Sequence, residues 1–500
     1  MTYPPGGSAN PAAAALAGAV ARGHDEAVIR LAPVDIVRRP IAQLEPVIGA
    51  ERFDRLIQVA AEFRARLAGR TVWNVNSTAN GGGVAEMLRA LLGYVIDLDV
   101  DTRWLVIGAD PDFFTVTKRL HNRIHGNLGD GGALGSAEAA HYEEVLGGNA
   151  KALADLVRPG DLVLLHDPQT AGLAGRLAQS GARVVWRCHI GIDEQNDLSR
   201  GAWDFLKPYL APAHAFVFSR RQYAPSWMPE TATAVIPPSI DPFSAKNQPM
   251  DEPTVLAILS WIGVLDDPAA DARRRFTRSD GTAGEVVRTA TVVADRLPGP
   301  RDRAVVQVSR WDRLKDMAGV MRGFAEHVAP SGQEFLALVG PAVAGVADDP
   351  EGAEVYEECL ALWRQLPTAI RRQILLVTLP LDDIEENAAM VNALQRWATV
   401  IAQKSLAEGF GLTVAEGMWK GRPTVGSAVG GIQDQIRDGN GILLPDPTDL
   451  VMFGRAVREL LTDPELAERL GAAAQAYVAA NFLGDLHLLR YANLFEPLLD

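Results

Sequence analysis

Hydrophobic positions along the chain follow two repeats, one typical of helices and one typical of buried strands. In residues 51–67 the apolar side chains recur every three or four positions, which predicts an amphipathic helix. Short apolar runs such as 71–76 and 162–166 predict strands, and strands and helices take turns along the chain. This alternation predicts parallel sheets covered by helices, the α/β class. Further strands are expected at 104–107, 183–187, 215–218, 233–236, 304–309, 335–339, 374–377, 399–402 and 424–426, and further helices at 84–96, 113–124, 171–178, 317–328, 450–461, 464–481 and 486–499.

The length of 500 residues predicts two domains, each with its own core. Residues 1–26 are rich in Ala, Gly and Pro and are expected to form a mobile tail. A proline-rich polar stretch divides the rest into an N-terminal βαβ domain, 27–240, and a C-terminal one, 241–484. The last helix, 485–500, is expected to join the first domain. The charged segment near 266–303 interrupts the second domain and is interpreted as an insertion.

Composition and charge limit the kinds of molecule that the protein is expected to bind. The formal net charge of −14 argues against nucleic acid, because a phosphate backbone requires a basic surface. No apolar run approaches the roughly 20 residues of a membrane span, so no membrane partner is expected. Cys188 and Cys359 are too few for a disulfide framework or a zinc site, which favours a cytoplasmic location. A homodimer is compatible with the sequence.

A glycine-containing turn separates two glutamates, Glu408 and Glu416. Gly409 and Gly411 leave the turn without side chains, and Thr413 is expected to cap the helix that follows. Backbone N–H groups at a helix N-terminus attract anions, so the turn suits a phosphorylated sugar held beside two carboxylates. The alternative is an ordinary loop with two surface glutamates.

A second glycine cluster, formed by Asn80, Gly81, Gly82 and Gly83, connects the strand 71–76 to the helix 84–96. A loop without side chains at the start of a helix has a geometry that can cradle phosphate. The alternative is a flexible turn. The cluster is not GxGxxG, which counts against a nicotinamide-dependent dehydrogenase.

Polar clusters follow two strands of the first domain and one strand of the second. Asp167 and His189 come directly after apolar strands, where ligands collect in parallel sheets. The alternative is that both are ordinary loop or capping residues. Arg310 and Lys315 flank the turn after strand 304–309, and a guanidinium and an ammonium together suit the two phosphates of a diphosphate. Ordinary surface cations are the competing interpretation.

Taken together, these segments resemble the retaining, nucleotide-sugar-dependent glycosyltransferases of the GT-B type, and within them the trehalose glycosyltransferring synthases. The resemblance spans roughly residues 35 to 500. It is carried by VWNVNSTANGGGVAEML (72–88), FFTVTKRLHN (113–122), RCHIGID (187–193), IPPSIDP (236–242), VSRWDRLKD (308–316) and EGFGLTVAEGMWKGRPTVGSAVGGI (408–432). It implies two Rossmann-like domains that face each other across a cleft.

The resemblance also implies a role for each candidate residue of the second domain. Arg310 and Lys315 would hold the donor diphosphate, Glu416 the ribose and Glu408 the donor glucose. The remaining donor-binding positions are Gly409, Phe410, Gly411, Leu412 and Thr413.

On the first domain, the resemblance assigns the loop Gly81, Gly82 and Gly83 to the donor phosphates. His189 would contact the donor sugar and count among the catalytic residues with Arg310, Lys315 and Glu408. Asp167 and Asn80 would bind sugar.

The reaction implied by the resemblance forms α,α-trehalose from UDP- or ADP-glucose and glucose, reversibly and with retention. The acceptor attacks on the front face, and the leaving phosphate takes its proton. No tightly bound cofactor and no protein-ligated metal site are expected, with Mg²⁺ at most a stimulant. Trehalose phosphorylase, using phosphate in place of the nucleoside diphosphate, is the nearest alternative enzyme. A sensor that binds nucleotide sugar without turnover is the alternative outside enzymes.

Overall fold

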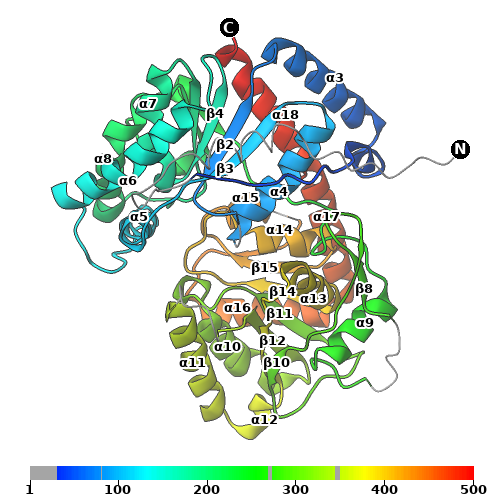
Figure 1. Cartoon of the computed structure of the whole chain (residues 1–500). Helices are drawn as coiled ribbons and strands as arrows, with labels where there is room; N and C mark the ends of the chain where they lie inside the picture. Colours follow the sequence, from blue (N-terminus) through cyan, green and yellow to red (C-terminus); the bar gives the residue numbers. More distant parts are fainter. Residues whose placement is uncertain (1–30, 80–81, 268–272, 344–349, 438) are drawn as a thin grey trace, which may run out of the picture. The chain divides into compact units, whose positions relative to one another are not determined.

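The computed structural model describes residues 31–79, 82–267, 273–343, 350–437 and 439–500. The expected N-terminal tail therefore lies outside the described residues. The chain divides into two compact units (Figure 1). Unit 1 contains the described residues up to Ile36, then Ile57–Val235 and Tyr491–Asp500, and unit 2 contains Val37–Leu56 and Ile236–Arg490.

Unit 1 is built on a seven-stranded sheet in the order β1-β3-β2-β4-β5-β6-β7. All neighbouring pairs are parallel except β1 with β3, so the predicted parallel sheet is confirmed. Its strands are β1 (Ala32–Pro33), β2 (Val72–Asn76), β3 (Thr102–Val106), β4 (Leu162–His166), β5 (Arg183–Cys188), β6 (Ala215–Phe218) and β7 (Thr233–Val235).

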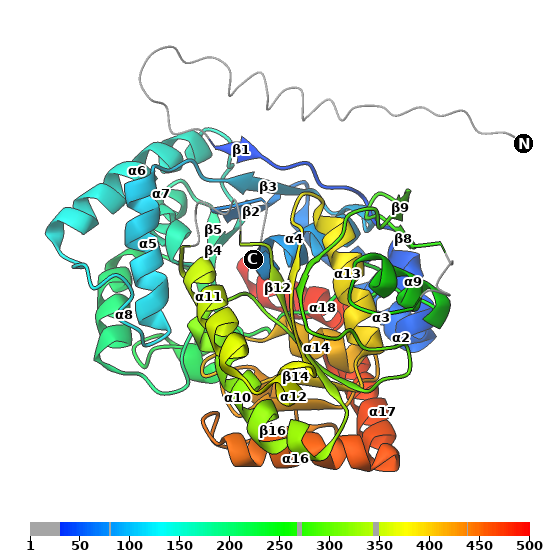
Figure 2. The same ribbon diagram turned by 90° about the horizontal axis from the view of Figure 1, so that it is seen from below.

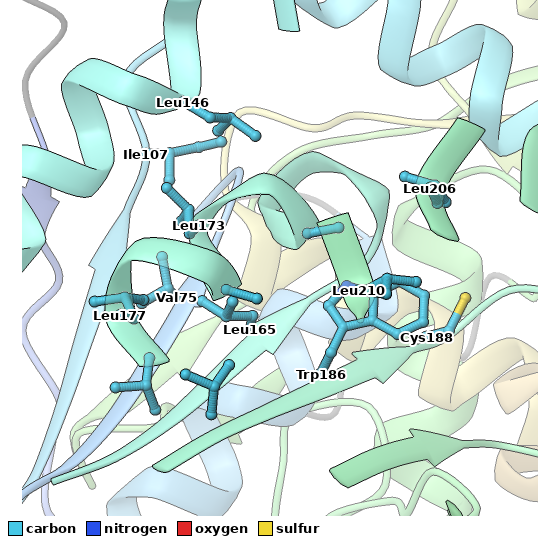
Figure 3. Close-up of a cluster of buried hydrophobic side chains, with 14 of the residues drawn as sticks. Val75, Ile107, Leu146, Leu165, Leu173, Leu177, Trp186, Cys188, Leu206 and Leu210 are labelled. Atoms are coloured by element: carbon cyan, nitrogen blue, oxygen red, sulfur yellow. The ribbon is translucent and has the colours of Figure 1, made fainter. Parts of the chain in front are cut away.

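Helices cover both faces of this sheet. On one face, Val75, Leu165 and Trp186 pack with Leu146 and Leu177 from two helices (Figure 3). On the other face, side chains of α4 pack against the buried indole of Trp104. The helices of unit 1 are α4 (Gly82–Asp97), α5 (Pro111–Ile124), α6 (Ser136–Ala154), α7 (Ala174–Gln179), α8 (Asp197–Leu210) and most of α3 (Ala50–Leu67), with a 3₁₀ segment at Pro168–Leu173.

Unit 2 repeats the plan with a sheet in the order β10-β13-β12-β11-β14-β15-β16. Only β10 among these strands runs antiparallel to its neighbour. The strands are β10 (Thr291–Val293), β11 (Ala304–Val308), β12 (Phe335–Pro341), β13 (Ile374–Leu379), β14 (Val400–Gln403), β15 (Thr424–Ser427) and β16 (Ile442–Leu444).

Alternate residues of the central strands of unit 2 enter two different cores. Val305 belongs to one core and Val306 to the other, as the two-residue repeat of a strand requires. The strands are therefore mostly apolar on both faces, because both faces are covered, with polar exceptions such as Gln307 and Gln403 near the strand ends. The helices are α2 (Glu45–Ile48), α9 (Glu252–Trp261), α10 (Met317–His327), α11 (Pro350–Gln365), α12 (Thr368–Arg371), α13 (Ile384–Trp397), α14 (Leu412–Trp419), α15 (Ile432–Gln435), α16 (Leu450–Thr462), α17 (Pro464–Asn481) and α18 (Gly484–Phe495), whose last residues belong to unit 1.

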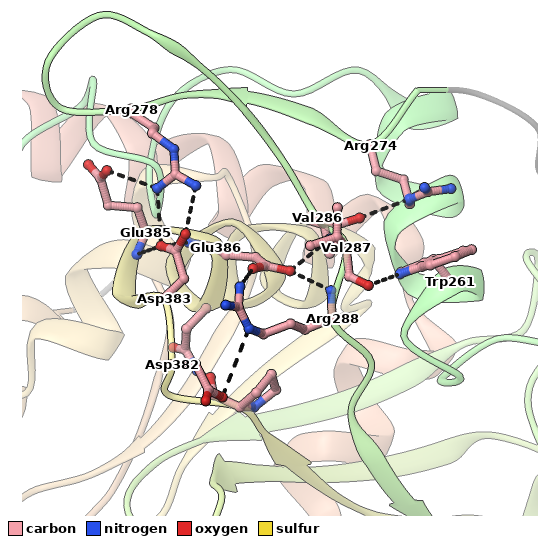
Figure 4. A network of polar contacts seen from close by, with 12 residues as sticks. Trp261, Arg274, Arg278, Val286, Val287, Arg288, Asp382, Asp383, Glu385 and Glu386 are labelled. Carbon is pink, nitrogen blue, oxygen red and sulfur yellow. Dashed lines mark hydrogen bonds and ion pairs between the residues drawn. The ribbon is translucent and has the colours of Figure 1, made fainter.

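The described part of the expected insertion is ordered and anchored. It forms the antiparallel pair β8 (Arg275–Thr277) and β9 (Ala283–Glu285), and then β10 adds to the edge of the large sheet. The buried carboxylate of Glu386 accepts the backbone N–H of Val287 and of Arg288 at 2.7 and 2.6 Å (Figure 4). Arg278 forms ion pairs with Asp383 and Glu385, and lowers the pKa of Asp383 to about 2. The insertion is thus fastened to the N-terminus of α13.

Two segments group differently from the expected domain bounds. Residues Val37–Leu56, expected in the first domain, belong to unit 2, where Arg39 forms an ion pair with Asp241. The proline-rich polar stretch that was expected to divide the two domains also belongs to unit 2. Within this unit, Ile240 pairs with Leu483 in an isolated β-bridge. Across the described ranges, every helix is too short or too polar to span a bilayer.

Candidate functional site

The turn between Glu408 and Glu416 connects β14 to α14 in unit 2. Gly411 precedes the helix in the left-handed region, with φ of 83°, a conformation that glycine adopts without strain. Helix α14 begins at Leu412, so Thr413 lies inside its first turn and is not the cap that the sequence suggested. The Thr413 hydroxyl contacts Gln403 Oε1 at 3.0 Å instead, which ties the helix to the end of β14.

A second loop supports this turn from outside the sequence motif. A Cβ at Gly431 would lie 2.6 Å from Phe410 Cα, so only glycine permits this approach. The N–H of Gly431 donates to Gly409 O at 2.9 Å, and the side-chain amide of the buried Gln435 donates to Phe410 O at 2.5 Å. The backbone from Gly409 to Gly411 is therefore held by main-chain and side-chain bonds. Gly431 and Gln435 follow the turn by about 20 residues, and the sequence alone does not show which loop they support.

Lys315 and Glu408 meet as an ion pair. Lys315 follows β11, Glu408 follows β14, and these strands are neighbours in the sheet. Lys315 Nζ lies 2.7 Å from Glu408 Oε2, and Ser405 Oγ is 3.3 Å from the same oxygen. Arg310 lies apart from this pair: its side chain is 59% exposed and contacts Asp312 at 3.1 Å.

Buried groups hold the backbone next to Lys315. Asp316 has a left-handed conformation, with φ of 48° and ψ of 45°. Lys404, fully buried, forms an ion pair with the Asp316 carboxylate and donates to Pro447 O at 2.6 Å. The Gln307 amide donates to Lys315 O at 2.7 Å. Lys404 stands four residues before Glu408, but its role depends on a contact with a residue 88 positions away.

Glu416 has a buried carboxylate, and only one of its two oxygens has a partner among the described residues. Its Oε1 lies 3.5 Å from Lys246 Nζ, whereas Oε2 has no hydrogen-bond partner among the described residues. Lys420, one turn later, donates to Asn247 Oδ1 at 3.0 Å and to Glu416 O at 3.1 Å. Burial lowers the pKa of Lys420 to about 7, against the opposing effect of the Glu416 charge. Because an unsatisfied buried acceptor is costly, Oε2 is suited to accept a hydroxyl from a ligand.

In unit 1, Asp167 follows β4 in a backbone conformation that is rare for any residue except glycine. Its φ is 63° and its ψ 176°. The backbone is fixed on both sides, since Asp167 N donates to Arg187 O at 2.7 Å and Trp186 Nε1 donates to Asp167 O at 3.0 Å. Its carboxylate accepts the N–H of His189 at 2.7 Å, and burial raises its pKa to about 7.

His189 lies in a group of buried polar side chains. His189 Nε2 is 3.0 Å from His166 Nδ1, and His166 Nε2 is 3.4 Å from Asn74 Oδ1. Arg187 Nε donates to His189 Nδ1 at 3.2 Å, while its Nη1 donates to the Tyr491 hydroxyl at 2.5 Å. Burial, with Arg187 nearby, lowers the pKa of His166 to about 3. Sequence reasoning found His189 but missed Asn74 and Tyr491, because neither stands near it in the chain.

The structure brings the predicted residues together in two groups, each within one unit. Asp167 and His189 are in direct contact in unit 1, and Lys315 and Glu408 are in direct contact in unit 2. Helix α4 begins at Gly82, so Gly82 and Gly83 lie in its first turn and not in the loop expected before residue 84. Asn80 and Gly81 lie outside the described residues. No group of three or more His, Cys, Asp or Glu side chains within the described ranges is arranged to hold a metal ion.

Comparison with known families gives two matches. Residues 74–225 match the family described as "Trehalose synthase, N-terminal domain", and residues 383–477 match "Glycosyl transferases group 1". The first match contains Asp167 and His189, and the second contains Glu408 and Glu416.

Similar whole proteins and solved structures agree with these matches. The chain is 34% identical to a trehalose synthase of Rubrobacter xylanophilus and 33% identical to one of Pyrococcus horikoshii, each over 92% of this chain and 97% of the relative. A trehalose phosphorylase of Pleurotus sajor-caju is 27% identical over 86% of this chain, and the match spans 58% of that protein. A UDP-forming trehalose-phosphate synthase from Burkholderia vietnamiensis has the same fold, with a TM-score of 0.61 at 18% identity, covering 86% and 98% of the two chains.

The phosphorylase is thus the more distant relative, and the predicted GT-B fold and glycosyltransferase class are confirmed. The chain belongs to the trehalose synthase family of glycosyltransferases.

Proposed function

We propose that this protein transfers glucose from a nucleoside-diphosphate glucose to free glucose and forms α,α-trehalose with retention. The observation that carries the proposal is the unpartnered Oε2 of Glu416, in a chain of the trehalose synthase family. A ribose hydroxyl would satisfy that oxygen, and inorganic phosphate has no ribose. The nucleotide donor is therefore favoured over the phosphate of a phosphorylase.

Charge changes during transfer define the roles proposed for unit 2. The bond from C1 of the donor glucose to the diphosphate breaks, and a bond from C1 to the acceptor oxygen forms. The diphosphate gains negative charge, which Lys315, Arg310 and the N-terminus of α14 would stabilise. The acceptor proton passes to the leaving phosphate, so the products are trehalose and the nucleoside diphosphate.

Glu408 would bind the donor glucose and not attack it. Its Oε2 pairs with Lys315 at 2.7 Å, and because a carboxylate can accept several hydrogen bonds at once, it can also accept one from a sugar hydroxyl. Retaining glycosidases use a carboxylate nucleophile, but in this proposal the acceptor attacks from the side on which the diphosphate leaves. For unit 1, we propose that His189 contacts the donor glucose and that Asp167, Asn80 and the three glycines Gly81 to Gly83 contact sugar or phosphate.

The test runs the reaction in both directions with purified protein. UDP-, ADP- and GDP-glucose are each incubated with glucose, and trehalose is identified by chromatography and by the NMR signal of its α,α linkage. Trehalose is then incubated with a nucleoside diphosphate or with phosphate. We expect nucleotide glucose from the first reverse reaction and no glucose 1-phosphate from the second.

Glucose 1-phosphate formed only with phosphate would replace the synthase by a phosphorylase. Binding of a nucleotide glucose without turnover of any acceptor would make the protein a sensor. Lys315→Ala protein prepared in parallel controls for contaminating transferase.

A further inference from the structure

Four buried polar side chains of unit 1 form a continuous series across neighbouring strands. Arg187 ends β5 with Cys188, His189 follows it, His166 ends β4, and Asn74 lies in β2. The strands β2, β4 and β5 are adjacent and parallel, so their side chains are brought side by side by the sheet. The contacts are 3.2 Å from Arg187 to His189, 3.0 Å from His189 to His166 and 3.4 Å from His166 to Asn74.

The chemistry of arginine gives this series a direction. A guanidinium has N–H donors and no acceptor, so His189 Nδ1 must accept from Arg187 Nε. A ring nitrogen that accepts carries no proton, and neutral His189 therefore has its proton on Nε2. That proton points to His166 Nδ1, which must accept in turn. The proton of neutral His166 is then on Nε2, where Asn74 Oδ1 receives it.

The geometry of the two imidazoles supports an in-plane bond between them. Their planes differ by 15°, and their centroids are 5.3 Å apart although the bonded nitrogens are only 3.0 Å apart. Two rings this far apart with such close nitrogens lie end to end, not face to face. The Nε2–H of His189 is thus aimed along the plane of His166, as a good hydrogen bond requires.

Tyr491 fixes the beginning of the series. Arg187 is fully buried, its Nη1 donates to the Tyr491 hydroxyl at 2.5 Å, and its Cζ lies 5.6 Å from the centre of that ring. Hydroxyl and ring face together hold the guanidinium in one orientation. Within the described residues, Arg187 also interacts electrostatically with the imidazole of His166, the carboxyl of Asp167 and the thiol of Cys188.

We propose that Arg187, held by Tyr491, is a positioning residue that fixes His189 as the neutral Nε2–H tautomer. His189 then serves glycosyl transfer as a fixed neutral group and not as a general base. This role rests on the proposed function, in which His189 contacts the donor sugar. With Nδ1 and Nε2 both bonded inside the protein, the ring has no lone pair for the acceptor's proton, which agrees with proton transfer to the leaving phosphate.

The tautomer can be read directly by NMR on the intact protein. The chain has nine histidines, which can be labelled with ¹⁵N in the ring. His189→Gln and His166→Gln identify the two sets of signals. At neutral pH we expect His189 and His166 both to show a protonated Nε2 and an unprotonated Nδ1. An Nδ1–H or doubly protonated His189 would overturn the proposal.

Arg187→Met tests whether the arginine sets that tautomer. It removes the donor to His189 Nδ1, so the His189 signals should move to the averaged values of two exchanging tautomers. Arg187→Lys, which keeps a charged donor, should restore part of the pattern. Arg183→Met at the other end of β5 is the matched control and should leave the pattern unchanged. An unchanged His189 pattern in Arg187→Met would refute the assignment.

Tyr491→Phe and kinetics complete the test. This variant removes one hydroxyl from a ring that stays in place, so it decides the matter if Arg187→Met does not fold. We expect Arg187→Met to lower kcat on the order of 10- to 100-fold, and Tyr491→Phe to lower it less. Normal turnover in both variants would also refute the positioning role. The NMR result needs no substrate, so failure of the proposed reaction in every variant, wild type included, would be recognised separately.

Discussion

In unit 1, the buried rings of His189 and His166, beyond β5 and at the end of β4, are joined by a hydrogen bond, whereas in unit 2, beyond β11 and β14, Lys315 and Glu408 are joined by an ion pair. Burial lowers the pKa of His166 to about 3 and raises that of Asp167 to about 7, so both shifts favour the uncharged forms. In unit 2 the ion pair of Lys315 and Glu408 lies on side chains that remain slightly exposed.

The difference matches two kinds of task. A departing diphosphate gains negative charge and needs a cation that can exchange one anionic partner for another. Lys315 would exchange the Glu408 carboxylate for the diphosphate. A neutral sugar needs groups held in fixed positions, which uncharged and well-bonded side chains provide. Two βαβ units of similar plan have thus placed opposite electrostatics at the ends of their strands.

The largest effect is expected for Lys315→Ala, which removes the positive charge of the ion pair in unit 2. Turnover should fall at least about 100-fold, the scale for losing one group that stabilises developing charge. Arg310→Ala should cost a similar factor if its guanidinium leaves Asp312 for the diphosphate. Initial rates of nucleoside-diphosphate release measure both.

Arg313→Ala in the same turn is the control, because Arg313 pairs with Glu358 at the surface, and it should leave turnover within about 2-fold. Near-normal turnover of folded Lys315→Ala would remove the leaving-group argument.

A smaller effect is expected for Glu416→Gln, which keeps the shape of the side chain and removes its charge. The KM for nucleotide glucose should rise about 10-fold with kcat little changed, because a ribose contact is the same in the ground and transition states. Steady-state kinetics with varied donor separates the two constants. Glu326→Gln on the exposed face of α10 is the control. A fall in kcat at unchanged KM would assign Glu416 to the chemical step instead.

The smallest effect concerns the neutral side of the comparison and depends on pH. Folding raises the pKa of Asp167 to about 7, so the folded state binds this proton more tightly than the unfolded chain. The stabilisation is full below about pH 4 and is lost as pH rises to 7. Between pH 5 and 7, the free energy of unfolding of the wild type should fall by about 1 kcal/mol relative to that of Asp167→Asn. This is less than the limit of about 1.4 kcal/mol per pH unit, because Asp167 is partly exposed.

Thermal melts of both proteins at several pH values measure this difference. His166, whose pKa is lowered, has the opposite pH dependence, but it is present in both proteins and cancels. A constant difference in Tm from pH 5 to 7 would show that Asp167 is ionised throughout. Unit 1 would then carry a charged carboxylate among its candidate residues, as unit 2 does.

Much of this fold was predictable because its signals are local. Strand 162–166 and helix 464–481 were predicted with the bounds that the structure shows, since each carries its own hydrophobic pattern. The glycine turn before Glu416 was predictable for the same reason. Strands β10 and β16 were missed, because their formation depends on pairing with β13 and β15, which a local pattern does not reveal.

The partners of the candidate residues were not predictable. Lys404 holds Asp316 and Lys246 approaches Glu416 across 88 and 170 residues of sequence, and charged residues at such separations carry no mark of their pairing. The prediction that Thr413 caps helix α14 was wrong for a different reason. Gly411 in the left-handed region starts the helix one residue before the threonine, and the sequence cannot distinguish these two starts.

The contact between Arg187 and Tyr491 has a consequence for biosynthesis, because the two residues are 304 positions apart in the chain. A ribosome adding about 5 to 20 residues per second needs roughly 15 to 60 s to proceed from one to the other. Throughout that time the nascent unit 1 carries a buried cation without its phenol partner. Its last step of assembly must therefore wait until Tyr491 has been made.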